Sequence, residues 1–248
     1  MNKANADDLG AYEKKQFVDS QGNILPYRIL FPEHYKDGNK YPLILFLHGA
    51  GERGNDNELQ LVHGGSLFLK NENRKQFPAV IVFPQCPHDA WWAAIDLDGN
   101  YLPVKLDFDY SRKITGPLNA SIELIQTLIK TEQVDSNRVY VVGLSMGGMG
   151  TFEAVYRYPN LFAAAIAICG GGDEKAYDKR VVKTPFWIFH GAADDVVEVN
   201  FSRKMVARLK ELKADVKYTE YPGIGHESWE NAFAEQELMP WLFSKRKN

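Results

Sequence analysis

Residues 139–147 read VYVVGLSMG, in which a run of β-branched and aromatic residues leads directly into the pattern G-x-S-x-G. Such a run predicts a buried strand. The residues that follow, Gly148–Tyr158, are compatible with a helix that Pro159 stops. A serine on a tight turn between a strand and a helix is held in strained backbone, and glycines two residues to either side let the two elements pass closely. We therefore predict that Ser145 is a nucleophile.

A serine hydroxyl is a weak nucleophile at neutral pH and needs a general base. Where such a turn carries a catalytic serine, the order along the chain is serine, acid, histidine, which leaves His190 and His226 as candidate bases. His226 lies in a glycine-rich loop after a predicted strand at Val216–Tyr221 and is the expected base, whereas His190 is expected to pack at a strand end. The acid is Asp194 or Asp195, which the local sequence alone does not separate.

The oxyanion that forms during attack on a carbonyl group needs preorganised N–H donors. The residue after the nucleophile, Met146, supplies one such donor through its backbone. The second is expected from the turn at 48–51, which reads HGAG and follows a continuous apolar run at Leu43–Leu47. Ala50 is the expected second donor, and Gly51 is the next candidate.

Strand-like runs alternate with helical periodicities over the rest of the chain. Strands are predicted at Tyr27–Phe31, Leu43–Leu47, Val80–Phe83, Arg138–Val142, Ala163–Ile168, Phe186–Phe189 and Val216–Tyr221. Apolar stripes at helical spacing are formed by Ile114, Leu118, Ile122, Ile125 and Ile129, by Phe201, Met205, Leu209 and Leu212, and by Phe233, Leu238, Trp241 and Leu242. This alternation predicts an α/β fold with a mostly parallel central sheet, helices on both faces and an antiparallel edge made by the first strands. We expect a single domain over residues 1–248, with residues 1–14 as a loose N-terminal extension.

The segment Gln85–Ser111 is the longest irregular part of the chain. Trp91 and Trp92 within it are predicted to bind substrate by walling an acyl or aromatic pocket, with core packing as the alternative. Polar side chains after the oxyanion turn, at Glu52, Arg53 and Asn55, either hydrogen-bond a polar substrate or brace the loop. The segment Gly170–Pro185 is too short and too charged to form an apolar cover, so we expect no large lid domain.

Four motifs together resemble the α/β-hydrolase superfamily of serine esterases. They are HGAGERG at 48–54, GLSMGG at 143–148, HGAAD at 190–194 and Gly225-His226. Within the superfamily, the chain resembles a branch of bacterial enzymes described as predicted peptidases, phospholipases/carboxylesterases and feruloyl-esterase-like enzymes, and the resemblance begins at about Phe17. It implies the α/β-hydrolase fold, a catalytic triad of Ser145, Asp194 and His226, and no cofactor. It places the acid on Asp194, although the family's usual proline after the acid is Asp195 here.

Composition and charge exclude several other classes of protein. The formal net charge is −3 and the chain carries no long basic stripe, so a nucleic-acid partner is not expected. Cys86 and Cys169 are predicted to be buried free thiols, and no cysteine or histidine spacing indicates a metal site. The longest apolar run, Leu161–Cys169, is too short to span a bilayer, so no membrane partner is expected. We expect a cytoplasmic protein, or a periplasmic or secreted one if a signal peptide preceded the numbered chain; the sequence does not indicate an oligomeric state.

These observations predict a serine hydrolase that cleaves small-molecule carboxylic esters with short or compact acyl groups through an acyl-enzyme intermediate. The same groups can cut amides, so a small peptidase or amidase is the enzymatic alternative. A non-catalytic binding protein of the same fold is the other alternative. It is disfavoured because every residue type of the triad is present in order.

Overall fold

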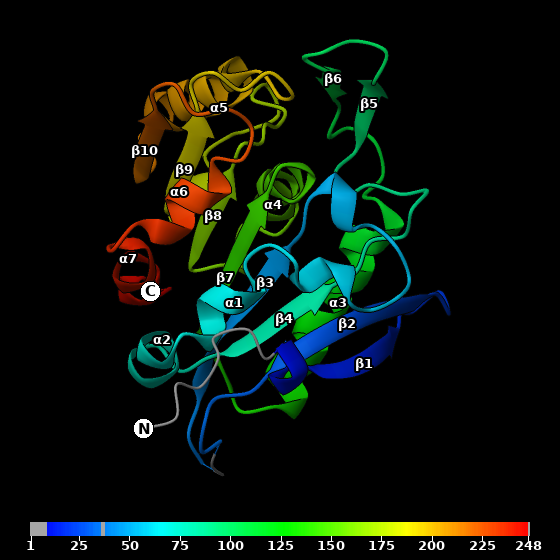
Figure 1. Cartoon of the computed structure of the whole chain (residues 1–248), viewed down its shortest axis with the longest axis vertical. Coiled ribbons are helices and arrows are strands. Elements are labelled where there is room, and N and C mark those ends of the chain that lie inside the picture. The colour runs from blue at the N-terminus through cyan, green and yellow to red at the C-terminus, as the bar shows by residue number, and fades with distance from the viewer. Residues whose placement is uncertain (1–8, 36–37, 248) are drawn as a thin grey trace.

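The computed structural model describes residues 9–35 and 38–247, which are built around one eight-stranded sheet (Figure 1). The strands lie in the order β1-β2-β4-β3-β7-β8-β9-β10. Their bounds are Glu13–Val18 (β1), Ile24–Leu30 (β2), Tyr41–Leu47 (β3), Val80–Pro84 (β4), Val134–Leu144 (β7), Ala164–Ile168 (β8), Phe186–Gly191 (β9) and Val216–Tyr221 (β10). The helices are α1 (Gly65–Leu69), α2 (Asn71–Gln76), α3 (Gly116–Thr131), α4 (Met146–Arg157), α5 (Val199–Glu211), α6 (Trp229–Ala234) and α7 (Leu238–Ser244).

Strand direction follows the prediction. β1 pairs antiparallel with β2, and β2 pairs antiparallel with β4, whereas β4, β3, β7, β8, β9 and β10 are all parallel. The predicted antiparallel edge and parallel centre are therefore confirmed. Because the carboxyl ends of parallel strands meet at one edge of a sheet, loops that are distant in sequence converge there.

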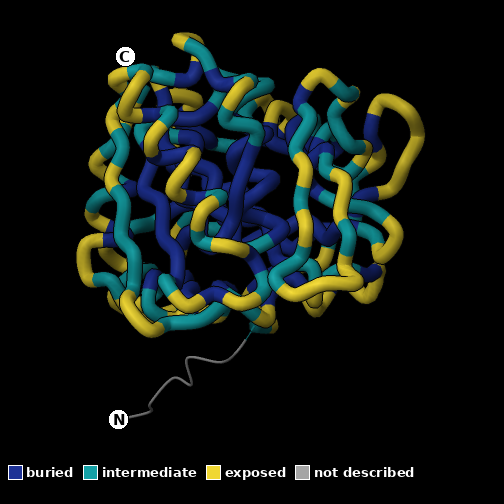
Figure 2. Tube along the Cα trace, turned by 90° about the horizontal axis from the view of Figure 1, so that it is seen from above, coloured by how far each residue is buried: buried dark blue, intermediate teal, exposed yellow. Residues whose placement is uncertain are grey.

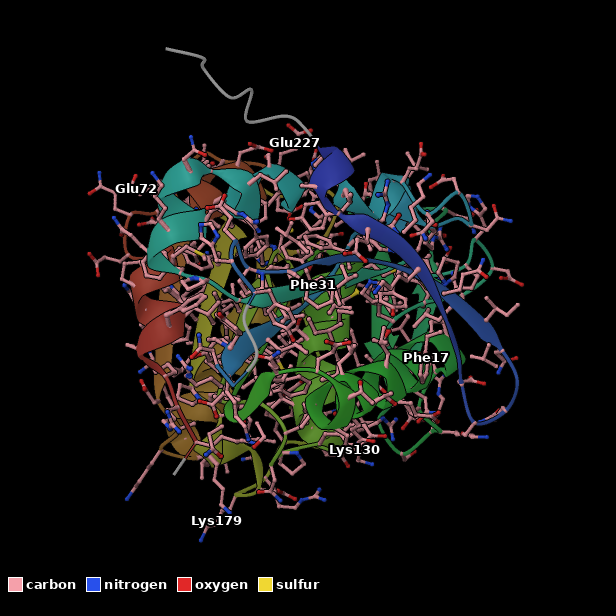
Figure 3. All side chains as sticks on the ribbon, turned by 90° about the horizontal axis from the view of Figure 1, so that it is seen from below. Phe17, Phe31, Glu72, Lys130, Lys179 and Glu227 are labelled. Carbon is pink, nitrogen blue, oxygen red and sulfur yellow. The ribbon has the colours of Figure 1, made fainter. Side chains whose placement is uncertain are left out.

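The centre of the sheet is buried on both faces, as its continuous apolar strands predict, whereas the edge strands β1 and β10 are partly exposed. In β3, Leu43, Leu45 and Leu47 face the layer that holds α3, α4 and α5, whereas Ile44 and Phe46 face the layer that holds α1, α6 and α7. Figure 2 shows the buried strands enclosed by partly exposed and exposed segments. Charged side chains such as Glu72 and Lys179 project outward at the rim of the molecule (Figure 3).

Three elements differ from the sequence prediction. The segment 85–111 is not wholly irregular but contains a hairpin of β5 (Ile95–Asp98) and β6 (Lys105–Phe108), which stands at the carboxyl edge of the sheet (Figure 1). The C-terminal stripe is divided between α6 and α7 rather than forming one helix. In the described part of the predicted loose extension, residues 9–14, the side chain of Tyr12 is buried, and its hydroxyl donates to the Gly65 carbonyl at 2.8 Å.

The connection between β8 and β9 contains only one short 3-10 helix, Val181–Lys183. The described residues thus hold no large lid domain in this connection, in agreement with the prediction. No helix in residues 9–35 or 38–247 is long and apolar enough to cross a membrane.

Candidate active site

Ser145 occupies the turn between β7 and α4, with φ 52° and ψ −118°. Two glycines make this turn possible. A Cβ on Gly143 would lie 2.1 Å from the Gly147 carbonyl oxygen, and a Cβ on Gly147 would lie 1.9 Å from the Leu47 carbonyl oxygen. No side chain fits at either position, so the G-x-S-x-G spacing is needed for strand and helix to cross. The strand–turn–helix that the sequence predicts is present.

His226 lies in the loop after β10 and joins the two other residues of the predicted triad. Its Nε2 atom is 3.0 Å from Ser145 Oγ, and its Nδ1 atom is 2.7 Å from Asp194 Oδ2. Because the Asp194 carboxylate only accepts, the Nδ1–H group donates to it, which leaves Nε2 free to accept the serine proton. Residues separated by 81 and 32 positions are thus in hydrogen-bond contact.

The carboxylate of Asp194 is buried after β9 and is held by the turn that follows it. Its Oδ1 atom accepts the N–H groups of Val196 and Val197, each at 2.9 Å. Burial alone would raise the pKa of Asp194, but hydrogen bonds from His190 and His226 outweigh burial and hold this pKa well below its usual range. Asp195 is exposed. Of the two adjacent acids, it is therefore Asp194 that contacts the imidazole.

His190 is buried near the end of β9, as the sequence predicts, but its contact with the triad carboxylate was not predicted. Its Nε2 atom lies 3.1 Å from Asp194 Oδ2 and 3.0 Å from the Val197 carbonyl oxygen. Both neighbours are acceptors, so Nε2 carries a proton and Asp194 Oδ2 receives hydrogen bonds from two imidazoles. Nδ1 lies 2.8 Å from Ser202 Oγ. The spacing His-Gly-x-x-Asp could have indicated this contact, because a turn of that length brings the histidine beside the acid.

The two predicted oxyanion donors both begin a helical turn. Met146 is the first residue of α4, and Ala50 is the first residue of the 3-10 helix Ala50–Glu52. The N–H group at such a position has no carbonyl of a preceding turn to bond, so it remains available to a ligand. Gly51, the second candidate, is exposed. The roles of Ala50 and Met146 as oxyanion donors stay predictions.

The turn at 48–51 is fixed by buried hydrogen bonds. His48 Nε2 accepts the Cys86 N–H group at 3.0 Å, its Nδ1–H group donates to the Gly49 carbonyl at 2.7 Å, and its own carbonyl accepts Trp92 Nε1–H at 3.0 Å. Burial lowers the pKa of His48 to about 4, so its ring is neutral in the folded protein at neutral pH. The neutral ring is required, because Nε2 is an acceptor.

The two tryptophans predicted to bind substrate have different surroundings. Trp92 is completely buried, and its ring packs beside His48 and Gly150. It braces the oxyanion turn from beneath, so its assignment as a substrate-binding residue is wrong: no part of the ring is open to a ligand. Trp91 is partly exposed, and the Arg53 guanidinium lies over its ring at 4.7 Å from the centroid. Its contact with substrate stays a prediction.

The structure also separates the polar residues after the oxyanion turn. Arg53 braces the loop, because its Nε–H group donates to the Ala50 carbonyl at 3.0 Å and a terminal N–H group reaches the Ala90 carbonyl at 3.4 Å. Asn55 is exposed. Glu52 has no comparable bracing bond within the described residues, and its carboxylate lies 3.7 Å from His63 Nε2.

Neither cysteine competes with Ser145 as a nucleophile. Cys86 and Cys169 are buried free thiols, as predicted, and burial raises the pKa of Cys86 to about 12. A thiol with such a pKa is not ionised at neutral pH. Within residues 9–35 and 38–247, no group of three or more His, Cys, Asp or Glu side chains could hold a metal ion.

Comparison with known proteins gives a consistent set of relatives. The phospholipase/carboxylesterase family matches residues 34–237. Carboxylesterase SOBER1 of Arabidopsis thaliana is 26% identical over 190 residues, which cover 74% of this chain and 82% of the plant protein. Acyl-protein thioesterase 1 of Neurospora crassa is 26% identical over 204 residues, covering 74% of this chain and 79% of the fungal protein. The crystal structure of a thermostable esterase superposes with a TM-score of 0.87 at 36% identity, over 96% of this chain and 64% of that esterase.

Proposed function

Because this chain belongs to the phospholipase/carboxylesterase family of α/β hydrolases, we propose that it hydrolyses carboxylic esters with short or compact acyl groups, using Ser145 as nucleophile. The observation that carries the proposal is the single imidazole of His226, which bonds Ser145 Oγ at 3.0 Å and Asp194 Oδ2 at 2.7 Å. Family membership gives the reaction class, a carboxylic ester hydrolase, and this contact supports Ser145, His226 and Asp194 as the residues that perform it.

The reaction follows from the protonation states that the contacts require. Ser145 Oγ attacks the ester carbonyl carbon while His226 Nε2 takes its proton, and Asp194 stabilises the imidazolium that forms. The N–H groups of Met146 and Ala50 receive the oxyanion. The tetrahedral intermediate collapses, His226 returns the proton to the leaving alcohol oxygen, and an acyl-enzyme remains. Water activated by His226 then attacks the acyl carbon and releases the acid.

The preference for short or compact acyl groups rests on what surrounds the site. In many lipases an apolar lid covers a long-chain pocket. Here the connection after β8 is short and polar, carrying Asp173, Glu174, Lys175, Asp178, Lys179, Arg180 and Lys183. Burying an acyl chain against unpaired charges is unfavourable. In the other segment near the site, 85–111, the ring of Trp92 is buried in the core and does not line a pocket for an acyl chain.

A labelling experiment tests the nucleophile directly. A fluorophosphonate probe should modify the wild-type protein on Ser145, and Ser145→Ala should lose both labelling and roughly a millionfold of the esterase rate while keeping the same circular dichroism spectrum. If the folded Ser145→Ala variant retains more than a few per cent of wild-type hydrolysis, another residue is the nucleophile.

A substrate series tests the acyl preference. Nitrophenyl esters from acetyl to palmitoyl should show the highest kcat/KM at the short end, without a rate increase above the solubility limit of the substrate. The highest kcat/KM on the longest chains would overturn the preference but not the nucleophile. Parallel assays with an amino-acyl anilide test the peptidase alternative.

A further inference from the structure

Glu52 lies beside the nucleophile. It is the last residue of the 3-10 helix Ala50–Glu52 that follows the oxyanion turn, and only 12% of its side chain is exposed. A Cβ placed on Gly49 would lie 2.9 Å from Glu52 Oε2 and 3.7 Å from Ser145 Cβ. The carboxylate and the nucleophile therefore flank the same point over Gly49.

The carboxylate of Glu52 lacks the hydrogen bonds that other buried carboxylates of this chain receive. Glu153 accepts the Ala94 N–H group and Arg157 Nε–H, both at 2.6 Å, and Asp194 accepts two N–H groups and two imidazoles. For Glu52, the nearest basic side chain within the described residues is that of His63, whose Nε2 atom lies 3.7 Å from Oε1, beyond hydrogen-bond distance. No side chain or backbone group within the described residues donates a hydrogen bond to this carboxylate, and its oxygens are not fully buried, so they remain open to donors from water or from a substrate.

A series of side-chain contacts connects Glu52 to His226 through His63 and Trp229. The His63 ring lies 5.0 Å from the ring of Trp229, and the Trp229 ring lies 5.5 Å from that of His226. His226 is also the group that returns a proton to the leaving oxygen. An alcohol part directed from His226 toward His63 would pass beside the Glu52 carboxylate.

We propose that Glu52 is a specificity-determining residue whose carboxylate accepts a hydrogen bond from a hydroxyl group on the alcohol part of the ester. The substrate class is then an ester of a short polyhydroxy alcohol rather than of a plain alkyl alcohol, and this inference rests on the proposed function. The negative charge of Glu52 also repels an anionic alcohol part, because both charges would be partly removed from water.

The test compares two acetate esters that differ in one group. Butyl acetate and 3-hydroxypropyl acetate have alcohol parts of the same length, with a methyl group in one where the other has a hydroxyl. A hydrogen bond to a charged acceptor is worth roughly tenfold or more in binding, so wild type should favour 3-hydroxypropyl acetate by about tenfold in kcat/KM. Glu52→Met, which keeps the length but accepts no such bond, should reduce this ratio to about one. Glu52→Gln, with a neutral acceptor, should give an intermediate ratio.

Glu227→Gln is the matched control, because it removes an exposed carboxylate beside His226 in sequence. It should keep the wild-type ratio. An equal loss of activity on both esters in Glu52→Gln and Glu52→Met would show that Glu52 only braces the loop, and an unchanged ratio would show no contact; either result overturns the inference. If Glu52→Met does not fold by circular dichroism, the ratio of Glu52→Gln decides.

Failure of this inference is distinguishable from failure of the proposed function. A wild-type protein that is labelled on Ser145 and hydrolyses both acetates with equal kcat/KM contradicts the role of Glu52 alone. A wild-type protein that hydrolyses neither acetate and takes no label on Ser145 contradicts the proposed function.

Discussion

Asp194 is the residue on which the site depends most, because its two oxygens together accept four hydrogen bonds. The turn supplies two of them to Oδ1, and His190 and His226 supply the other two to Oδ2. His190 is itself oriented by Ser202, whose hydroxyl donates to the Gly170 carbonyl at 2.9 Å. A carboxylate bonded on every side cannot rotate, so Oδ2 stays directed at the imidazole of His226.

We predict that His190→Phe lowers kcat by roughly 10- to 100-fold, the factor expected for losing a hydrogen bond to a charged group. KM should change little, because the His190 side chain is completely buried and presents no surface to a substrate. Steady-state kinetics on a nitrophenyl acetate provide the measurement, and thermal unfolding establishes that the variant is folded. Asp195→Asn is the control and should have wild-type kinetics. A folded His190→Phe variant with wild-type kcat would contradict this positioning role.

The sequence was sufficient to predict that Ser145 and His226 lie together, because motif spacing and chain order restrict the candidate nucleophiles and bases to one or two. It did not separate Asp194 from Asp195 on physical grounds, because adjacent acids in a turn differ only in the direction of their side chains. The contact between His190 and Asp194 was missed for the same reason. Its partners lie four, seven and twelve residues onward, and only the folded turn brings them to the ring.

At the scale of elements, the segment 85–94 fixes the oxyanion turn from two directions. The Cys86 N–H group donates to the His48 ring, and Trp92 Nε1–H donates to the His48 carbonyl. The start of the hairpin that follows is anchored in turn by Glu153, which accepts the Ala94 N–H group at 2.6 Å. The turn that carries Ala50 is therefore held by buried bonds and not only by its own backbone.

We predict that Trp92→Phe lowers kcat about 5- to 10-fold and equally for all acyl chain lengths, because it leaves the His48 carbonyl unsatisfied at a cost of about 1 kcal/mol or more. Trp91→Phe is the matched variant and keeps the His48 carbonyl bonded. The kcat/KM profile over the nitrophenyl ester series is the measurement. A change of acyl preference in Trp92→Phe would mean that its ring reaches the substrate after all.

The strands and helices that are most buried were the ones that the sequence predicted best. The parallel strands were recognised because both their faces are covered, which makes them continuously apolar. The hairpin β5–β6 was missed because its strands are short, partly exposed and contain Asp96, Asp98 and Asp107, which disfavour strands. The burial of Tyr12 was missed because most of the residues around it in sequence are exposed.

At the scale of the whole molecule, one sheet edge collects the loops that form the site. The oxyanion turn follows β3, Ser145 follows β7, Asp194 follows β9 and His226 follows β10. All four strands are parallel, so their carboxyl ends share an edge and the convergence could be predicted from chain order alone. The bonds between loops could not be predicted, because they depend on contacts between segments far apart in sequence.

The bond between His48 and Cys86 ties the stability of the whole fold to pH. Burial lowers the pKa of His48 from its ordinary 6.5 to about 4, with a further lowering from the charge of Arg53. Above pH 6.5 the ring is neutral in both the folded and the unfolded chain. Between pH 6.5 and 4 the unfolded chain binds a proton that the folded chain does not, so the free energy of unfolding falls as the pH falls.

We predict that this single residue removes about 3 kcal/mol from the free energy of unfolding between pH 7 and pH 4, since each pKa unit corresponds to about 1.4 kcal/mol. In His48→Gln the amide oxygen can still accept the Cys86 N–H group but does not titrate. This variant should therefore lose much less stability over the same range, whatever its stability at pH 7. Urea unfolding at pH 7, 5.5 and 4 is the measurement, and His88→Gln, which removes an exposed histidine, is the control. Equal pH dependence in wild type and His48→Gln would mean that other groups destabilise the fold in acid.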